Sequence, residues 1–327
     1  MNKLNEQYRQ LTQEPRYQIS ALRKTGMGLR GIAKEIGVHY STVSRELNRN
    51  SPPNGYSGAE AHPLSDIRKR TSFKANKRHS HTDDIIRGSV ILGWSPETVS
   101  LRMTVESKVT ETLSHTTIYR RIEENRLQGG HLYRQLPRFG KTRWKGGKRN
   151  KKAGVRLIHD RVDITERPDI VDARTRLGDW EGDTVHGQSA HLVTLVDRTS
   201  RFTLAKRVFS KTKEEVGDAM IALLKTAHTV KTVTLDNGGE FAGHVRVSKA
   251  TGADMYFAKP YASWQRGTNE NTNGRIRRFW PKKFDMGKLT DDEIERRILL
   301  LNFTPRKVLG GLTPFEVYMG QGVALIT

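Results

Sequence analysis

The stretch LGDWEGDTVHGQSAHLVTLVDRTSRFTLAKRV, residues 177–208, decides the fold class of this chain. It contains three strand-like runs separated by short turns, which predict a three-stranded meander. The runs are 180–185, 191–196 and 202–208. Residues 213–228 then place their apolar side chains on one helical face, and 230–235 form a short apolar strand. Three strands, a helix, a further strand and a helix-rich tail predict a mixed α/β domain.

Several carboxylates stand at notable positions in this domain. Acidic residues are otherwise scarce, since the whole chain has 35 Asp and Glu against 57 Lys and Arg. The first strand offers Asp179, Glu181 and Asp183, which period-two alternation places on one face, so the pattern alone does not choose among them. Asp236 directly follows the fourth strand, and the carboxyl end of a strand is a favoured position for a site. Glu270 opens a later helix among several arginines.

Each acid also has a simpler interpretation, because Asp236 begins a turn-like sequence and Glu270 has arginines at ion-pairing distance along the chain. Taken together, they predict a metal site. Oxygen ligands suit Mg²⁺ or Mn²⁺. Two such ions about 3.5–4 Å apart can hold the attacking and leaving oxygens of a phosphodiester displacement. We therefore expect carboxylates from different elements to converge on two metal ions.

Composition restricts the kind of partner. The chain has 327 residues, enough for two or three domains, and a formal net charge of +22. Because Lys and Arg occur along the whole chain, nucleic acid is favoured over a membrane surface as the partner. The absence of cysteine excludes disulfides and thiolate zinc sites. Without a signal segment or an apolar run of roughly 20 residues, we expect a cytoplasmic protein with no membrane partner.

Residues 17–50 have the pattern of a helix-turn-helix module. Three short amphipathic segments are separated by Gly26 and Gly37. The third segment is expected to present hydroxyls and arginines to a DNA groove and its phosphates. These residues are Tyr40, Ser41, Ser44, Arg45 and Arg49. The alternative is a three-helix bundle with a solvated basic face.

A second helical module is predicted over residues 81–128, with a helical spacer as the alternative. Ser95 and Pro96 form a helix start, and Ile118 and Ile122 point inward at helical spacing. The residues expected to face DNA are Thr116, Thr117, Arg120 and Arg121.

Residues 131–156 contain ten Lys and Arg and no acidic residue, which predicts a cationic strap that follows phosphates. Arg143, Lys148 and Arg149 are its expected DNA contacts. The expected organisation is a helix-turn-helix domain 1–52, a linker 53–80, the second module 81–128, a basic linker 129–160 and an α/β domain 161–327 with a helical tail.

Three motifs carry a family resemblance that extends over nearly the whole chain. They are GDWEGD (178–183), LDNGGEF (235–241) and SWQRGTNEN (263–271). They resemble the corresponding motifs of the IS30 family of bacterial insertion-sequence transposases.

The resemblance implies an RNase-H-like core, similar to that of retroviral integrases, with a DDE triad of Asp183, Asp236 and Glu270 as catalytic metal ligands. It favours Asp183 over the other acids of the first strand, and 33 residues separate Asp236 from Glu270, as the family pattern expects. The arginines around Glu270 resemble a basic–Glu–basic signature, which implies DNA contacts. They are Arg266, Arg275, Arg277 and Arg278.

The implied activity is Mg²⁺- or Mn²⁺-dependent cleavage at terminal inverted repeats, followed by 3′-OH strand transfer into target DNA through a circular intermediate. The resemblance also implies at least a dimer that works on DNA in the bacterial nucleoid. A repressor with an inert core would leave the ordered carboxylates unexplained, and the zinc module of a retroviral-type integrase needs cysteine. A tyrosine recombinase would act without metal, so metal-dependent cleavage discriminates against it.

Overall fold

The computed structural model describes residues 10–53, 55–72, 80–106, 112–140, 158–260 and 262–325. The chain divides into two compact units, Met1–His79 and Ser80–Thr327, and each is described by itself. Arg143, Lys148 and Arg149 of the expected basic strap lie outside the described residues.

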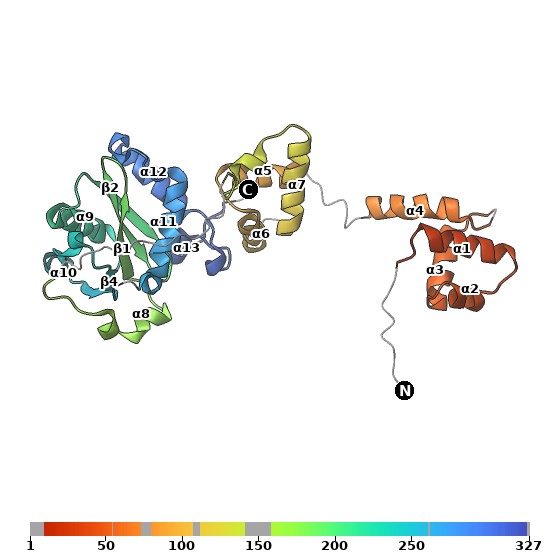
Figure 1. Cartoon of the computed structure of the whole chain (residues 1–327), viewed down its shortest axis with the longest axis horizontal. Helices are drawn as coiled ribbons and strands as arrows, with labels where there is room; N and C mark the ends of the chain where they lie inside the picture. Colours follow the sequence, from red (N-terminus) through yellow and green to blue (C-terminus); the bar gives the residue numbers. More distant parts are fainter. Residues whose placement is uncertain are drawn as a thin grey trace. The chain divides into compact units, whose positions relative to one another are not determined.

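The first unit begins with the three helices that the sequence predicts, α1 (Gln13–Lys24), α2 (Leu29–Glu35) and α3 (Tyr40–Asn50) (Figure 1). Gly26 and Gly37 both have a positive φ, which allows the tight turns between these helices. The helices bury one apolar cluster, whose members include Ile19, Ile32, Ala33, Val43 and Leu47.

Residues 53–80, expected to be a linker, contain a further helix, α4 (Gly58–Thr71), which packs on α1. A Cβ at Gly58 would lie 2.6 Å from the carbonyl oxygen of Arg16, so the two helices meet backbone to backbone. The buried Arg16 side chain donates to Glu46 of α3 at 2.7 Å and to Ser65 of α4 at 3.0 Å. Arg16 of α1 therefore links α4 to α3 through its hydrogen bonds.

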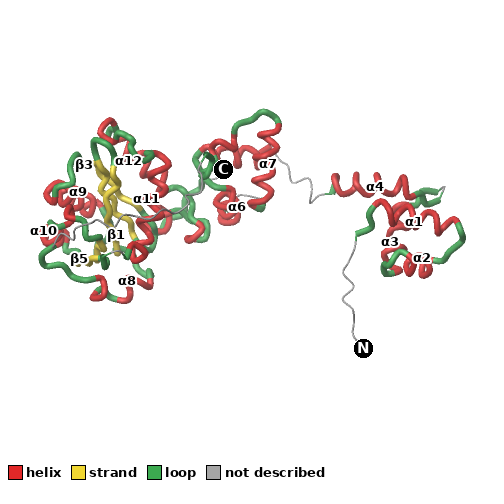
Figure 2. Tube along the Cα trace, viewed as in Figure 1, coloured by secondary structure: helices red, strands yellow, loops and turns green. Residues whose placement is uncertain are grey.

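The second unit is built on a five-stranded mixed sheet (Figure 2). Its strands are β1 (Asp179–His186), β2 (His191–Asp197), β3 (Thr203–Val208), β4 (Thr232–Leu235) and β5 (Asp254–Phe257). The spatial order is β3-β2-β1-β4-β5. The first three strands are antiparallel, whereas β4 is parallel to β1 and β5 is parallel to β4. The predicted meander and fourth strand are present, and β5 was not predicted.

Helices cover both faces of the sheet. The helices α9 (Lys213–Thr226) and α10 (His244–Thr251) share one apolar cluster with Trp180 of β1. The helices α11 (Gly267–Phe279) and α12 (Asp291–Asn302) share the opposite cluster with Val185. The odd-numbered residues of β1, including its three acids, therefore face α11 and α12.

The remaining helices of this unit are α5 (Ser80–Ile91), α6 (Pro96–Val105), α7 (His115–Leu127), α8 (Asp169–Ala173) and α13 (Pro314–Met319). The helices α5 to α7 enclose a separate apolar cluster that includes Val90, Val99, Met103 and Ile118. Within the described ranges, no helix combines the length and apolarity that crossing a membrane requires.

The C-terminal tail packs against the sheet and against α6. Tyr318 of α13 stacks on Phe202 with ring centroids 4.3 Å apart, inside the cluster under the sheet. Two residues earlier, Glu316 accepts hydrogen bonds from both terminal nitrogens of Arg102 in α6, at 2.7 and 2.9 Å. Arg102 and Glu316 are buried, and Glu106 completes the ion-pair network.

Candidate active site

Asp183 lies on β1, and Asp236 directly follows β4, the parallel strand next to β1. Glu181 pairs with Thr234 across β1 and β4, so continuing the register by two residues brings Asp183 beside Asp236. One guanidinium bridges them: Arg266 contacts Asp183 at 3.2 Å and Asp236 at 2.9 Å. Both acids are open to solvent, with side-chain exposures of 22% and 42%.

The contacts of Arg266 differ from those expected. It is buried, and it also donates to the carbonyl oxygen of Gly182 at 2.6 Å. Burial opposes its charge, but the carboxylates of Asp183 and Asp236 outweigh that effect and raise the pKa of Arg266. In this structure the guanidinium of Arg266 is therefore engaged by the acids, and its expected contact with DNA stays a prediction.

The third expected ligand, Glu270, is exposed in the first turn of α11. Asn273, on the next turn, donates to the second carboxylate oxygen of Asp183. Across the described part of the chain, no three His, Asp or Glu side chains are grouped so that they could hold a metal ion. The expected convergence of all three acids is therefore not seen among the described residues, and Arg266 and Asn273 contact the two oxygens of Asp183 instead.

Burial separates the three acids of β1, which the sequence pattern left equivalent. Asp179 is buried against Arg176, at 2.8 and 3.0 Å. Glu181 is also buried and accepts from Arg198 at 2.6 Å and from the backbone amide of Asn269 at 3.1 Å. Because Asn269 lies in the first turn of α11, Glu181 anchors the start of the helix that carries Glu270.

The loop after β4 is shaped around Asp236. The amide of Gly238 donates to Asp236 at 2.9 Å. A Cβ at Gly238 would lie 2.9 Å from the same Asp236 oxygen and 2.5 Å from a carboxylate oxygen of Glu240. With a larger residue at this position both carboxylates would have to shift, so the glycine leaves room for them as they lie.

Sequence reasoning missed a group of polar side chains beside these acids. Lys211 forms an ion pair with Glu240 and lies 3.0 Å from the ring of His186. Burial, followed by the charge of Lys211, lowers the pKa of His186. Glu240 belongs to the quoted motif LDNGGEF, so its proximity to Asp236 was available as a signal. No local pattern relates Lys211 to His186, because they belong to separate elements.

In the third helix of the first unit, α3, none of the five residues expected to face DNA is buried. Tyr40, Arg45 and Arg49 are exposed, and Ser41 and Ser44 are half-buried. Together they leave one face of α3 open to a ligand, as a recognition helix requires.

In α7, Thr116 and Arg120 are exposed and Thr117 is half-buried. Arg121, however, is buried and donates to Thr82 at 2.8 Å and to Asp83 at 2.9 Å. Its expected contact with DNA is wrong, because position 121 shares the inner face of the helix with Ile118 and its charge is bound by the start of α5.

The remaining arginines of α11 lie in cationic surroundings. Arg278 is exposed, whereas Arg275 and Arg277 are half-buried. Arg277 lines a hollow of about 510 Å³ together with Lys282 and Lys283. Burial lowers the pKa of Arg277. This hollow also includes His186, so positive charge extends from the acidic site along α11.

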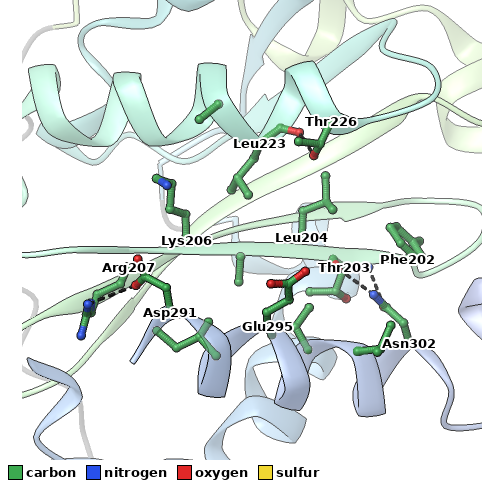
Figure 3. Close-up of a pocket in the computed structure, with 15 residues that line it drawn as sticks. Phe202, Thr203, Leu204, Lys206, Arg207, Leu223, Thr226, Asp291, Glu295 and Asn302 are labelled. Atoms are coloured by element: carbon green, nitrogen blue, oxygen red, sulfur yellow. Dashed lines mark hydrogen bonds and ion pairs between the residues drawn. The ribbon is translucent and has the colours of Figure 1, made fainter. Parts of the chain in front are cut away.

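A separate groove of about 430 Å³ follows the edge strand β3 between α9 and α12 (Figure 3). None of the three expected metal ligands lines it. Asn302 accepts from the amide of Thr203 at 2.8 Å and donates to its carbonyl oxygen at 2.9 Å. This side chain therefore satisfies backbone groups that an edge strand would otherwise offer to another chain.

Comparison with known proteins agrees with this architecture. Residues 7–50 match the family model described as "Helix-turn-helix domain", and residues 174–263 match "Integrase core domain". The integrase-core match and the mixed sheet confirm the RNase-H-like fold class. The catalytic core domain of BIV integrase aligns at 21% identity with a TM-score of 0.35, covering 43% of this chain and 93% of that one.

Two curated relatives extend over almost the whole chain. The transposase for insertion sequence element IS4351 of Bacteroides fragilis is 39% identical over 313 residues, covering 94% of this chain and 95% of the relative. Transposase InsI for insertion sequence element IS30A of Escherichia coli (strain K12) is 35% identical over 328 residues, covering 96% and 84%. The chain belongs to the IS30 family of insertion-sequence transposases.

Proposed function

We propose that this transposase cuts and joins DNA with Asp183, Asp236 and Glu270 as its catalytic triad. The observation that carries the proposal is a pair of solvent-accessible aspartates, Asp183 on β1 and Asp236 directly after the adjacent parallel strand β4, bridged by the buried guanidinium of Arg266. Two carboxylates this close would repel one another without a positive charge between them. Structural acids of the same strand, such as Glu181, are instead fully buried.

The donor set fits a divalent cation. Carboxylate oxygens are the ligands that Mg²⁺ and Mn²⁺ prefer, and Arg266 supplies positive charge at the position where the aspartates demand it. Asp183, Asp236 and Glu270 would hold two such ions. When bound, the ions would activate the attacking water and stabilise the leaving oxygen of the phosphodiester.

The protein's own residues would organise the site around DNA. Arg266 must release the aspartates as a cation binds, which frees its charge for the nearby phosphates. Glu181 holds the first turn of α11, which carries Glu270, against β1. Asn273 orients Asp183 from the same helix.

The proposed reaction has two steps at one site. Water attacks a phosphorus at the end of the element, the bond to the 3′ oxygen breaks, and a free 3′-OH remains. That 3′-OH then attacks a phosphorus in another strand, displacing its 3′ oxygen and forming the new phosphodiester. We propose a circular intermediate with abutted ends, in a bacterial cytoplasm where the protein is associated with the nucleoid.

Recognition would be divided between the helical modules and the core. The exposed face of α3 is our candidate reader of the terminal inverted repeats, and the exposed residues of α7 would contact a second part of the end. Because two ends must be processed together, we propose at least a dimer.

The test uses Asp183→Asn, Asp236→Asn and Glu270→Gln in the full-length protein. Each should abolish Mg²⁺-dependent cleavage and strand transfer on labelled end DNA, while end binding in a gel-shift assay stays near wild type. Asp254→Asn is the matched control, because Asp254 is an exposed acid at the start of β5. Cleavage by Asp236→Asn at the wild-type rate would refute the triad.

The arrangement of subunits has its own test. A protomer carrying Asp236→Asn is mixed with a protomer lacking residues 1–52. If one subunit reads the DNA that its partner cuts, the mixture recovers activity. A mixture that associates but stays inactive would show that each subunit cuts the end it binds.

A further inference from the structure

A cationic pocket lies beside the start of α11, and neither Asp183 nor Asp236 lines it. A pocket of about 450 Å³ is lined by Arg174, Arg201, Arg275 and Arg306, which we call the arginine pocket. These side chains come from four separate segments of the chain, so the fold gathers them. Gly267 and Thr268, in the first turn of α11, and Lys307 also line the pocket.

Arg306 is the most unusual member of the arginine pocket. Only 4% of it is exposed, and among the described residues its side chain makes one hydrogen bond, from Nη2 to the carbonyl oxygen of Leu301 at 3.0 Å. Its Nε and Nη1 atoms are buried and have no hydrogen-bond partner among the described residues. A buried guanidinium with unsatisfied donors is costly unless an anion completes it.

The surroundings of Arg306 add positive charge. Burial, followed by Arg275, Arg278 and Arg201, lowers its pKa well below the usual value. Burial and neighbouring arginines likewise lower the pKa of Arg201 and of Arg275 to about 10. Among the acids, Glu181 does most to raise the pKa of Arg201. Glu181 is already bound to Arg198 and to the amide of Asn269.

We propose that the arginine pocket binds one phosphate group of the DNA backbone. The unsatisfied Nε and Nη1 donors of Arg306 and the Nε of Arg201, which also has no partner among the described residues, are charged N–H groups of the kind that phosphate oxygens accept from. The first turn of a 13-residue helix lines the same pocket, and a helix N-terminus favours an anion.

The position of the arginine pocket explains what it would do. Arg266 contacts the catalytic aspartates just before α11, whereas Thr268, two residues later, accepts from Arg201 at 2.8 Å. The two sites therefore flank the same turn. A phosphate held in the arginine pocket would fix the DNA strand next to the turn that carries Glu270. This role rests on the proposed function, because it takes DNA as the substrate.

The experiment compares wild type with Arg306→Gln and Arg201→Gln in the full-length protein. Lys249→Gln is the charge-matched control, since Lys249 is exposed on α10 on the opposite face of the sheet. The measurements are the affinity for cognate and random duplexes across a salt series, and the melting temperature with and without inorganic phosphate.

Each pocket variant should weaken binding to both duplexes about tenfold and reduce the salt slope by about 1, whereas Lys249→Gln should show the wild-type slope. Phosphate should raise the melting temperature of wild type and of Lys249→Gln more than that of Arg306→Gln. Without phosphate, Arg306→Gln should melt no lower than wild type, because it removes an unpaired buried charge.

Two results would overturn the inference. If DNA affinity and salt slope are unchanged in both pocket variants, the pocket does not bind DNA, even if free phosphate still stabilises the protein. If Arg306→Gln and Lys249→Gln weaken binding equally, only overall charge matters. Failure of the proposed function is separately visible, because wild type would then bind DNA with the pocket-dependent slope but not cleave it with Mg²⁺.

Discussion

Replacing Glu316 by Gln should destabilise the second unit, because Glu316 is the carboxylate that holds Arg102 of α6 against the C-terminal tail. Arg102 is almost fully buried and donates to Glu316 through both terminal nitrogens. The variant keeps the size of the side chain but removes its charge. Arg102 would then depend on Glu106 alone for charge compensation.

The magnitude follows from the pKa of Glu316. Burial opposes the charged form, but hydrogen bonds from Arg102 and from the amides of Val323 and Thr313 lower this pKa from 4.5 to about 2. At about 1.4 kcal/mol per pH unit, and discounted for solvent screening, the charge contributes about 2–3 kcal/mol at neutral pH. For a unit of this size, that corresponds to a melting temperature lower by roughly 5–10 °C.

The assay is thermal and urea unfolding followed by circular dichroism from pH 7 to pH 3. The folded pKa lies below the unfolded one, so the stability gained from the charge is fully present above about 4.5 and is lost as the pH falls toward 2. The difference between wild type and Glu316→Gln should therefore shrink below pH 4.5.

The matched control is Glu123→Gln, which removes a carboxylate from a fully exposed ion pair with Arg126. It should change the melting temperature little, because exposed pairs are screened by water. If Glu316→Gln and Glu123→Gln change the melting temperature equally little at pH 7, the charge of Glu316 does not stabilise the fold as inferred.

Three further predictions concern the modules and the histidines. Arg45→Ala should weaken binding to end DNA by about 1–3 kcal/mol in a gel-shift assay if Arg45 reads guanine, with little effect on random DNA; equal loss on both would assign it to phosphate. Arg121→Gln should lower the urea midpoint because the side chain is buried, whereas Arg120→Gln should reduce DNA affinity at unchanged stability; the reverse result would contradict the burial argument. Burial, with charged neighbours, lowers the pKa of His186 and His191, so unfolding monitored against pH should show stability falling below pH 6.5, and a variant lacking both rings should lose that slope.

The sequence by itself determined the elements that depend on local periodicity. Alternation over 177–208 predicted three strands, and glycine-punctuated helical spacing predicted α1 to α3. These signals are readable because backbone geometry alone sets the periods of strands and helices. The position of Asp236 after an apolar strand was likewise visible, since the carboxyl end of a strand is a local feature.

Only the tertiary structure decided which of the long, charged side chains are buried in ion pairs and which stay exposed. Arg121 and Arg266 look like surface cations in the sequence, but their partners come from other elements and bury them. The acids of β1 share one face, yet packing by α11 and Arg198 buries Glu181 and leaves Asp183 open. The arginine pocket joins residues 174 to 306, so no local pattern could reveal it. Burial of a flexible charge depends on distant neighbours, and only the fold supplies them.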